Sequence, residues 1–122
     1  MHKKTLVVGA SPNPDRYSHE AVVRMKAQGY DVIPIGIRQG TIAGIEILDL
    51  KLRPLLKDIH TISIYLSAQN QTEWQGYLLS LKPQRIIFNP GAENDVFKKE
   101  AINHNIEAIN ACNLVMLSVG NF

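Results

Sequence analysis

Short apolar runs separated by helix-like stretches dominate this sequence and restrict the folds that it can adopt. The runs are rich in β-branched residues and begin about 20 to 30 residues apart; they are Leu6–Val8, Val32–Ile35, Ile62–Leu66, Ile86–Phe88 and Ile106–Ile109. Uninterrupted apolar runs are typical of parallel strands, because such strands are buried on both faces. The alternation predicts one α/β domain over residues 1–122, a doubly wound parallel sheet of about five strands in three α/β/α layers.

Four helices are expected between and after these runs. Ser18 is a suitable cap for the first helix, which should end at Gly29, and Asn94 is a suitable cap for the last. The ranges that we expect for the other three helices are 53–58 with Pro54 in its first turn, 72–81, and 95–104. The apolar tail Leu114–Phe122 is expected to cover the core as a small strand or helix, or to form part of a subunit contact.

The expected strand order is 3-2-1-4-5, which places the topological switch point between strands 1 and 4. Ligands of doubly wound sheets bind there, beyond the carboxyl ends of the strands. The segments expected at this edge are 9–18, 36–39, 67–70, 89–94 and 111–113.

Composition argues against several classes of protein. The 122 residues carry a formal net charge of +2 with dispersed cations, so we expect no nucleic-acid partner. No apolar run approaches the roughly 20 residues that span a bilayer, and Met1–Lys4 leads directly into a strand without a signal peptide. A lone cysteine, Cys112, excludes an internal disulfide, and the four histidines lack metal-ligand spacing. We therefore expect a cytoplasmic protein without a metal.

The loop after the first run has the features of a phosphate-binding turn. Gly9-Ala10-Ser11 ends the strand, Asn13 favours a turn, and Arg16 stands before the first helix. Phosphates gather at such places because the helix N-terminus presents unpaired N–H groups and partial positive charge. The G-x-G-x-x-G fingerprint of NAD sites is incomplete here, and a purely structural turn is the alternative.

The end of the second run distinguishes between nucleotides. NAD sites place a carboxylate there for the ribose hydroxyls, but this chain has Gly36-Ile37-Arg38. A cation such as Arg38 suits a ribose that carries a phosphate, as in NADP or coenzyme A (CoA). The alternative is that Arg38 is an ordinary exposed loop charge.

The loops after the third and fourth runs offer small and polar groups. Ser67 and Ala68 are candidates for the wall of an adenine pocket, or for a simple capped turn. Asn89 offers a donor and an acceptor, and Gly91 permits close backbone approach. No nucleophile–histidine–acid arrangement stands out, so a catalytic role is not assigned.

Two segments together resemble a known family. Val7-Val8-Gly9-Ala10-Ser11-Pro12-Asn13-Pro14-Asp15-Arg16 and Gly29-Tyr30-Asp31-Val32-Ile33-Pro34, with Gly44 and a last strand running into Cys112, are similar to the stand-alone CoA-binding proteins. The domain of these proteins is like the amino-terminal domain of the succinyl-CoA ligase α subunit. The resemblance covers nearly the whole chain. Ile35-Gly36-Ile37 and Phe88-Asn89-Pro90-Gly91 depart from the pattern common in the family.

The resemblance implies a Rossmann-like domain that holds CoA or acyl-CoA by its ADP portion. It implies phosphate contacts from the first loop, nucleotide phosphates near Arg38, and adenine or ribose near Ser67. Ligase activity is not implied, because those enzymes use a phosphohistidine from another domain. Taken with the loops above, the residues expected to bind the ligand are Gly9, Ala10, Ser11, Asn13, Arg16, Ser18, Gly36, Arg38, Ser67, Ala68, Asn89 and Gly91.

The sequence therefore predicts a small-molecule nucleotide-binding protein, with CoA or acyl-CoA as ligand and without catalysis of its own. An NAD(P)-binding oxidoreductase subunit is one alternative. A nucleotide-responsive interaction module is another, and a homo-oligomer or a partner subunit is compatible with all three.

Overall fold

The apolar runs form one parallel sheet. A computed structural model describes residues 3–122 of the chain. The strands of the sheet are β1 (Thr5–Val8), β2 (Val32–Gly36), β5 (Leu48–Asp49), β6 (Thr61–Ile64), β7 (Arg85–Phe88) and β8 (Glu107–Asn110). Their order is β5-β2-β1-β6-β7-β8, and each neighbouring pair is parallel. The expected doubly wound α/β class is confirmed, with six strands where about five were expected.

The expected strand order was wrong for one strand. The run at 62–66 was placed beyond strand 2, but β6 pairs directly with β1, with Leu6 opposite Ile62. The third strand along the chain in this sheet is instead β5, whose two residues pair with the end of β2. With β5 counted, the order is 3-2-1-4-5-6, the order of the classic doubly wound dinucleotide-binding sheet. The switch point therefore lies between β1 and β6, so the loop across from Gly9 is the one after β6.

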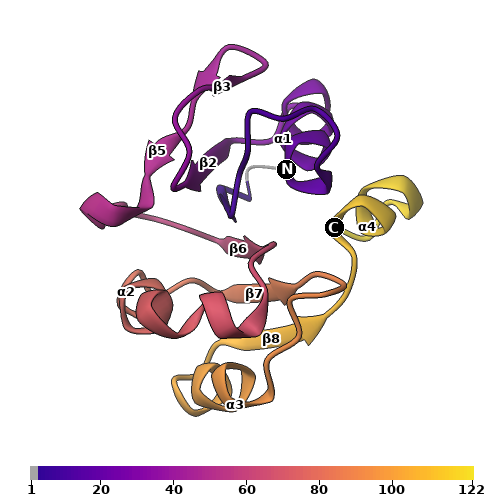
Figure 1. Ribbon diagram of the computed structural model, residues 1–122. Helices are drawn as coiled ribbons and strands as arrows, with labels where there is room; N and C mark the ends of the chain where they lie inside the picture. Colours follow the sequence, from indigo (N-terminus) through magenta and orange to yellow (C-terminus); the bar gives the residue numbers. More distant parts are fainter. Residues whose placement is uncertain (1–2) are drawn as a thin grey trace.

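Helices cover both faces of the sheet (Figure 1). They are α1 (Tyr17–Ala27), α2 (Gln75–Ser80), α3 (Asp95–Asn103) and α4 (Asn113–Val119). Successive strand residues alternate between the two faces, so Leu6 and Val8 pack toward α2 and α3 whereas Val7 packs toward α1 and α4. The result is two apolar cores separated by the sheet.

Short elements join the main ones. Between β2 and β5 lies a hairpin of β3 (Thr41–Ile42) and β4 (Ile45–Glu46), whose Ile42 is fully buried against the α1 side of the sheet. Three 3-10 turns follow, η1 (Leu50–Leu52), η2 (Ala68–Asn70) and η3 (Thr72–Trp74).

Two of the expected helix features were wrong. Ser18 does not cap α1: the helix begins at Tyr17 with Arg16 at the N-cap, and Ser18 is buried inside the first turn. Residues 53–58 form no helix, because Arg53 and Asp58 take left-handed backbone conformations with φ of 44° and 60°. The residue before a proline also disfavours helical geometry, which affects Arg53 ahead of Pro54.

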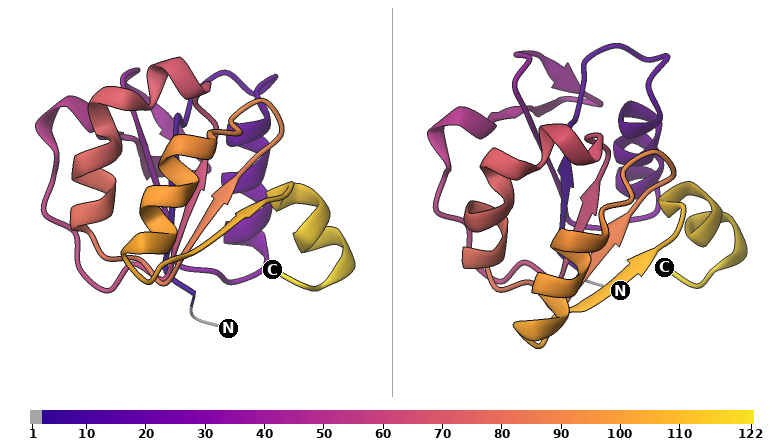
Figure 2. Two further views of the ribbon diagram at one scale, coloured as in Figure 1. Left: turned by 90° about the horizontal axis from the view of Figure 1, so that it is seen from below. Right: turned by 60° about the horizontal axis from the view of Figure 1, so that its bottom comes forward.

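The other three expectations agree with the structure. Asn94 caps α3 by accepting a hydrogen bond from the Phe97 N–H at 3.0 Å, and the helix at 72–81 is present as η3 followed by α2. The tail forms α4, whose Met116 and Leu117 are buried in the core together with Phe122. Both views of Figure 2 show α4 beside α1.

Candidate functional site

A cleft opens at the carboxyl ends of β1, β2 and β6, the edge where doubly wound sheets bind ligands. Its volume is about 490 Å³. The residues that line it are Gly9, Ala10, Ser11, Arg16, Tyr17, Ser18, Gly36, Ile37, Arg38, Leu50, Tyr65, Leu66, Ser67, Asn70, Trp74 and Pro90. Segments that are far apart in sequence thus meet at one concave surface.

The fold gathers most of the expected site residues here. Those in the lining are Gly9, Ala10, Ser11, Arg16, Ser18, Gly36, Arg38 and Ser67. Those outside it are Asn13, Ala68, Asn89 and Gly91. Contact of these residues with a ligand stays a prediction.

Asn13 and Asn89, both outside the lining, have internal partners. The Asn13 side chain accepts from the Asp15 N–H at 3.0 Å, which makes it the turn residue that the sequence indicated. Asn89 is buried; its amide donates to Ser63 Oγ and Ile64 O and accepts from the Asn113 N–H at 2.8 Å. This amide joins β6, β7 and α4, which is a structural role.

The N–H groups of the first loop are only partly free. Gly9 and Ala10 both donate to the carbonyl of Ile35, at 2.9 and 3.1 Å, which ties the end of β1 to β2. These two N–H groups are therefore occupied by an internal acceptor, whereas the sequence suggested unpaired N–H groups in this loop. Within residues 3–122, the Ser11 N–H has no acceptor, so it is the donor that the loop retains.

The N-terminus of α1 supplies the remaining donors. Arg16 is the N-cap residue, and no side chain caps the helix. In the described part of the chain, the N–H groups of Tyr17, Ser18 and His19 have no acceptor, as expected for an uncapped first turn. The Ser18 hydroxyl also lacks a partner there, although Ser18 is only 4% exposed and lines the cleft. Four unpaired donors and the positive end of the helix thus converge on one place.

Two glycines make room for this arrangement. A Cβ on Gly36 would lie 2.5 Å from the carbonyl oxygen of Ala10, so the end of β2 packs directly on the first loop. Gly9 has a φ of +89°, and a Cβ there would meet Leu66 at 3.1 Å. Backbone atoms of three strand ends approach one another as only glycine allows.

Cations and hydroxyls provide the rest of the polar surface. Arg16 and Arg38 are exposed at the cleft, and no carboxylate is among its lining residues. Ser67 Oγ accepts from the Asn70 amide at 3.0 Å, which leaves its own proton free to donate. The cleft therefore offers positive charge and donors, the surface that an anionic ligand requires.

An apolar wall was missed from the sequence. Leu50 and Trp74 line the cleft and are almost fully buried, and the guanidinium of Arg53 lies 4.7 Å from the centre of the Trp74 ring. The sequence signal that could have indicated Trp74 was its position near the start of the helix expected at 72–81. Leu50 carried no local signal, because it follows a strand of only two residues.

Tyr65 forms another part of the wall and also went unnoticed. Burial raises the pKa of its hydroxyl, and the nearby thiol of Cys112 acts in the same direction. Its hydroxyl oxygen is buried and has no hydrogen-bond partner in residues 3–122. Cys112 is a partly buried free thiol and does not line the cleft.

Gln71 stabilises the loops that carry these lining residues. Its fully buried amide donates to Leu66 O at 2.8 Å and to Ala92 O at 2.7 Å, and it accepts from Asn94 at 2.9 Å. The loops after β6 and β7 are thereby held together.

A larger groove, of about 810 Å³, lies at the opposite end of the strands. Its lining includes Leu79, Lys82, Gln84, Glu100 and His104, from the carboxyl ends of α2 and α3. Among residues 3–122, no three His, Cys, Asp or Glu side chains are grouped to hold a metal ion; His2 lies outside the described residues. No helix in that range is long and apolar enough to cross a membrane.

Comparison with known proteins shows which family the chain belongs to. The model of a CoA binding domain family matches residues 3–118, so the chain belongs to this CoA-binding-domain family. A solved structure of an uncharacterized protein is 41% identical, with a TM-score of 0.96 over 100% of this chain and 99% of the other. Among curated proteins, no relative matches the chain. The resemblance read from the sequence is confirmed.

More distant structures share the fold. A hypothetical protein from Pyrococcus horikoshii OT3 is 20% identical, with a TM-score of 0.82 over 97% of this chain and 83% of that one. The dinucleotide forming acetyl-coenzyme A synthetase 1 of Ca. Korarchaeum cryptofilum, in complex with phosphate and ADP, is 14% identical. Its TM-score is 0.69 over 92% of this chain and 26% of the synthetase. The Rossmann-like fold thus recurs as one part of a CoA-using enzyme.

Proposed function

We propose that this protein binds CoA or an acyl-CoA, with the diphosphate of the ligand at the N-terminus of α1. The observation that carries the proposal is the set of unpaired donors there: the N–H groups of Tyr17, Ser18 and His19 and the Ser18 hydroxyl. An uncapped helix N-terminus beside a glycine-rich strand end is a favourable site for a phosphate. Membership of the CoA-binding-domain family supports CoA over other nucleotides.

The cations at the cleft support the same ligand. Arg38 follows the end of β2, the place where a nucleotide-binding sheet meets the ribose. In this proposal the Arg38 guanidinium pairs with the 3′-phosphate of CoA, and Arg16 neutralises part of the diphosphate charge. The absence of a carboxylate among the lining residues disfavours NAD, whose ribose hydroxyls need an acceptor.

The two walls of the cleft fit the uncharged parts of CoA. The adenine lies against Leu50 and Trp74, which supply an apolar surface, and the Ser67 hydroxyl donates to an acceptor on the base or the ribose. The pantetheine arm leaves the diphosphate toward Pro90 and Tyr65, past the loops after β6 and β7. No residue is assigned a catalytic role, so the proposed activity is binding.

Binding of four nucleotides tests the proposal. The thermal stability of the protein is measured with CoA, 3′-dephospho-CoA, NAD and NADP, each at about 100 times its expected Kd. A bound ligand at that excess stabilises the folded state by about 2.7 kcal/mol. We expect CoA to raise the melting temperature most and 3′-dephospho-CoA to raise it less.

Other outcomes lead to other functions. A larger shift with NADP than with CoA would favour an NADP-binding oxidoreductase subunit. No shift with any nucleotide would contradict the proposal and leave an interaction module as the better explanation.

A further inference from the structure

Two glycines fix the position of the segment that carries Arg38. Residues 36–40 run beside the loop after β1, and the two stretches touch at both ends of the segment. At one end, a Cβ on Gly36 would lie 2.5 Å from Ala10 O; at the other, a Cβ on Gly40 would lie 2.7 Å from Pro12 Cβ. Both distances are shorter than real Cβ contacts, so any side chain at either position must push the segment and the loop apart.

The hairpin after Gly40 holds that contact closed. Gly40 O accepts from the Ile47 N–H at 2.9 Å, across the base of the hairpin. At its tip, Ala43 O accepts from the Lys26 ammonium of α1, and Ile42 is fully buried beneath. The hairpin is therefore fastened to the same helix whose N-terminus faces the cleft.

Arg38 lies midway between the two glycines, and both Arg38 and Ser11 line the cleft. Its neighbours Ile37 and Gln39 are exposed, so no packing of adjacent side chains fixes it. The two close approaches set how far the Arg38 backbone lies from the loop that leads into α1. A fixed distance between a cation and an anion-binding helix end selects ligands whose two anionic groups have the matching separation.

We propose that Gly40 is a positioning residue for ligand specificity: its contact with Pro12 holds Arg38 where it recognises a ribose phosphate while α1 binds the diphosphate. This inference rests on the proposed function and assigns to the hairpin contact the selection of phosphorylated ribose. It concerns the difference in affinity between two ligands and leaves the diphosphate site itself unchanged.

The test is the ratio of the Kd for 3′-dephospho-CoA to the Kd for CoA, measured by titration calorimetry. For the unmodified protein we expect a ratio of about 10 or more, the effect of one charge-assisted phosphate contact. Gly40→Ala should lower the ratio to about 3 or less, while its Kd for 3′-dephospho-CoA changes by less than about threefold, because the α1 donors are untouched.

Gly44→Ala is the matched control. Gly44 lies in the same hairpin and also has a positive φ, +81°, but the nearest atom to its Cβ position is Lys26 Nζ at 3.7 Å. The substitution thus also places a Cβ on a positive-φ glycine of the hairpin, with less strain than at Gly40, whose φ is +151°, and without the collision, so the ratio should stay as in the unmodified protein.

A second variant applies if Gly40→Ala folds poorly. Pro12→Gly removes the ring that Gly40 packs against and leaves Gly40 unchanged, so it should lower the ratio as well, and an unchanged ratio in Pro12→Gly would contradict the inference. An unchanged ratio in Gly40→Ala, or an equal loss of affinity for both ligands, would overturn the inference. If the unmodified protein bound neither ligand, the proposed function itself would fail.

Discussion

Ser18 is a residue at which ligand binding and folding stability should respond differently to substitution. Its hydroxyl lies in the first turn of α1, nearly buried and without a partner among the described residues. Its oxygen is not among the side-chain atoms that are both buried and unpaired, so it is open to the cleft, where a ligand phosphate would supply a partner. We predict that Ser18→Ala weakens CoA binding about 10-fold or more while the free energy of unfolding without ligand stays the same or increases slightly.

Titration calorimetry and urea denaturation measure the two effects. Ser118→Ala is the control, because Ser118 is an exposed serine of α4 far from the cleft. Equal CoA affinities for the Ser18→Ala variant and the unmodified protein would argue against the phosphate site at α1.

Trp74 gives a direct optical signal from the cleft. It is the chain's one tryptophan, 7% exposed, with its ring covered on one side by the Arg53 guanidinium. Because indole emission responds to nearby polar and stacking groups, we predict that CoA changes the fluorescence intensity or wavelength in a saturable way. The Kd from fluorescence should match the calorimetric one, whereas adenosine-free pantetheine should leave the emission unchanged. An invariant spectrum at saturating CoA would contradict the proposed position of the adenine against Trp74.

His60 makes stability depend on pH. Burial lowers its pKa from 6.5, and the positive charges of Arg85 and Lys3 act in the same direction, whereas Glu107 opposes them. Thr61 Oγ1 accepts from Arg85 Nε at 3.1 Å and lies 2.7 Å from His60 Nδ1. Its own proton is available to an unprotonated Nδ1, an arrangement that suits the neutral ring, the form that the lowered pKa favours.

The sign of the pH effect follows from this lowered pKa. The unfolded chain takes up the His60 proton at a higher pH than the folded protein does, so stability is lost as the pH falls below 6.5. We predict that the free energy of unfolding decreases between about pH 7.5 and about pH 5.5, and that His60→Gln flattens this dependence. Urea denaturation at several pH values measures it, and an identical slope in the variant would contradict the role of His60.

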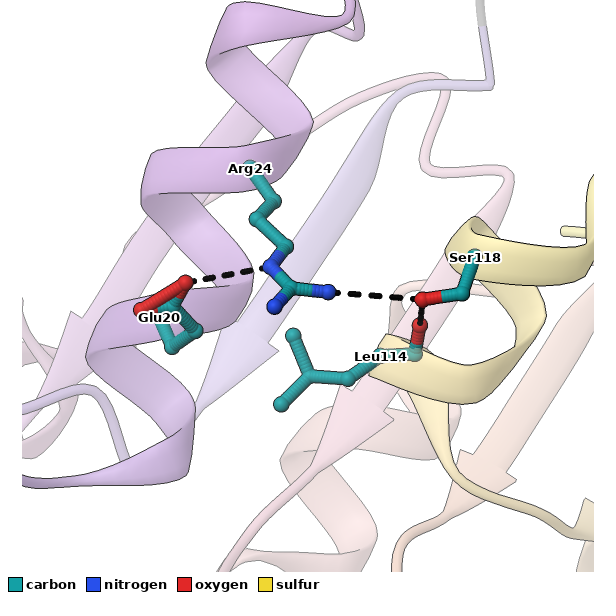
Figure 3. Close-up of polar contacts among 4 residues, drawn as sticks. All are labelled: Glu20, Arg24, Leu114 and Ser118. Carbon is teal, nitrogen blue, oxygen red and sulfur yellow. Dashed lines mark hydrogen bonds and ion pairs between the residues drawn. The ribbon is translucent and has the colours of Figure 1, made fainter.

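At the scale of elements, α4 is held by its apolar side more than by its polar link to α1. Arg24 of α1 pairs with Glu20 at 3.0 Å and donates to Ser118 of α4 at 3.4 Å (Figure 3). Both charged side chains are nearly half exposed, so water screens the pair and its contribution is small. Leu117 of α4 is instead buried in the core between the two helices.

These contacts predict unequal effects of two substitutions. Arg24→Ala should lower the free energy of unfolding by less than about 1 kcal/mol, and Leu117→Ala by about 2 to 4 kcal/mol. Urea denaturation with a common slope gives both values. A larger loss for Arg24→Ala would mean that the polar link, and not the apolar contact, positions α4.

Elements with local signals were predictable, and those defined by distant contacts were not. α3 was found with its cap, because Asn94 and the apolar spacing are both local. β5 has two residues and exists only through its pairing with β2, so no run of apolar residues announced it. Because β5 was not expected, the strand order was shifted. The loop after β7 was therefore expected across the switch point from Gly9, where the structure has the loop after β6.

The candidate site was predictable to a similar degree. Residues at strand ends were found, because parallel strands bring their carboxyl ends to one edge. Trp74 and Leu50 were missed, since they reach the cleft from elements whose position depends on tertiary packing. The occupied N–H groups of Gly9 and Ala10 were also invisible, because their acceptor, Ile35 O, belongs to another strand.

At the scale of the whole molecule, the two hollows lie at opposite ends of the strands and differ in electrostatics. The cleft faces the N-terminus of α1, whereas the larger groove is lined by residues from the carboxyl ends of α2 and α3. Helix dipoles are positive at the N-terminus and negative at the C-terminus. The helix N-terminus and the two arginines therefore favour an anionic ligand at the smaller hollow, whereas the lining of the larger groove holds one lysine, Lys82, and one carboxylate, Glu100, so volume alone does not locate the site.

Hydrogen exchange distinguishes the two hollows in one experiment. The N–H groups of Tyr17, Ser18 and His19 have no acceptor in the described chain, so they should exchange rapidly in the free protein. We predict that saturating CoA slows exchange in the segments 11–19, 36–39 and 66–70, and leaves 79–84 and 100–106 unchanged. Protection at 79–84 and 100–106 instead would place the ligand in the larger groove and contradict the electrostatic argument. Mass spectrometry of peptides spanning these segments, with and without CoA, provides the measurement; protection confined to 11–19 would reduce the site to a simple phosphate site.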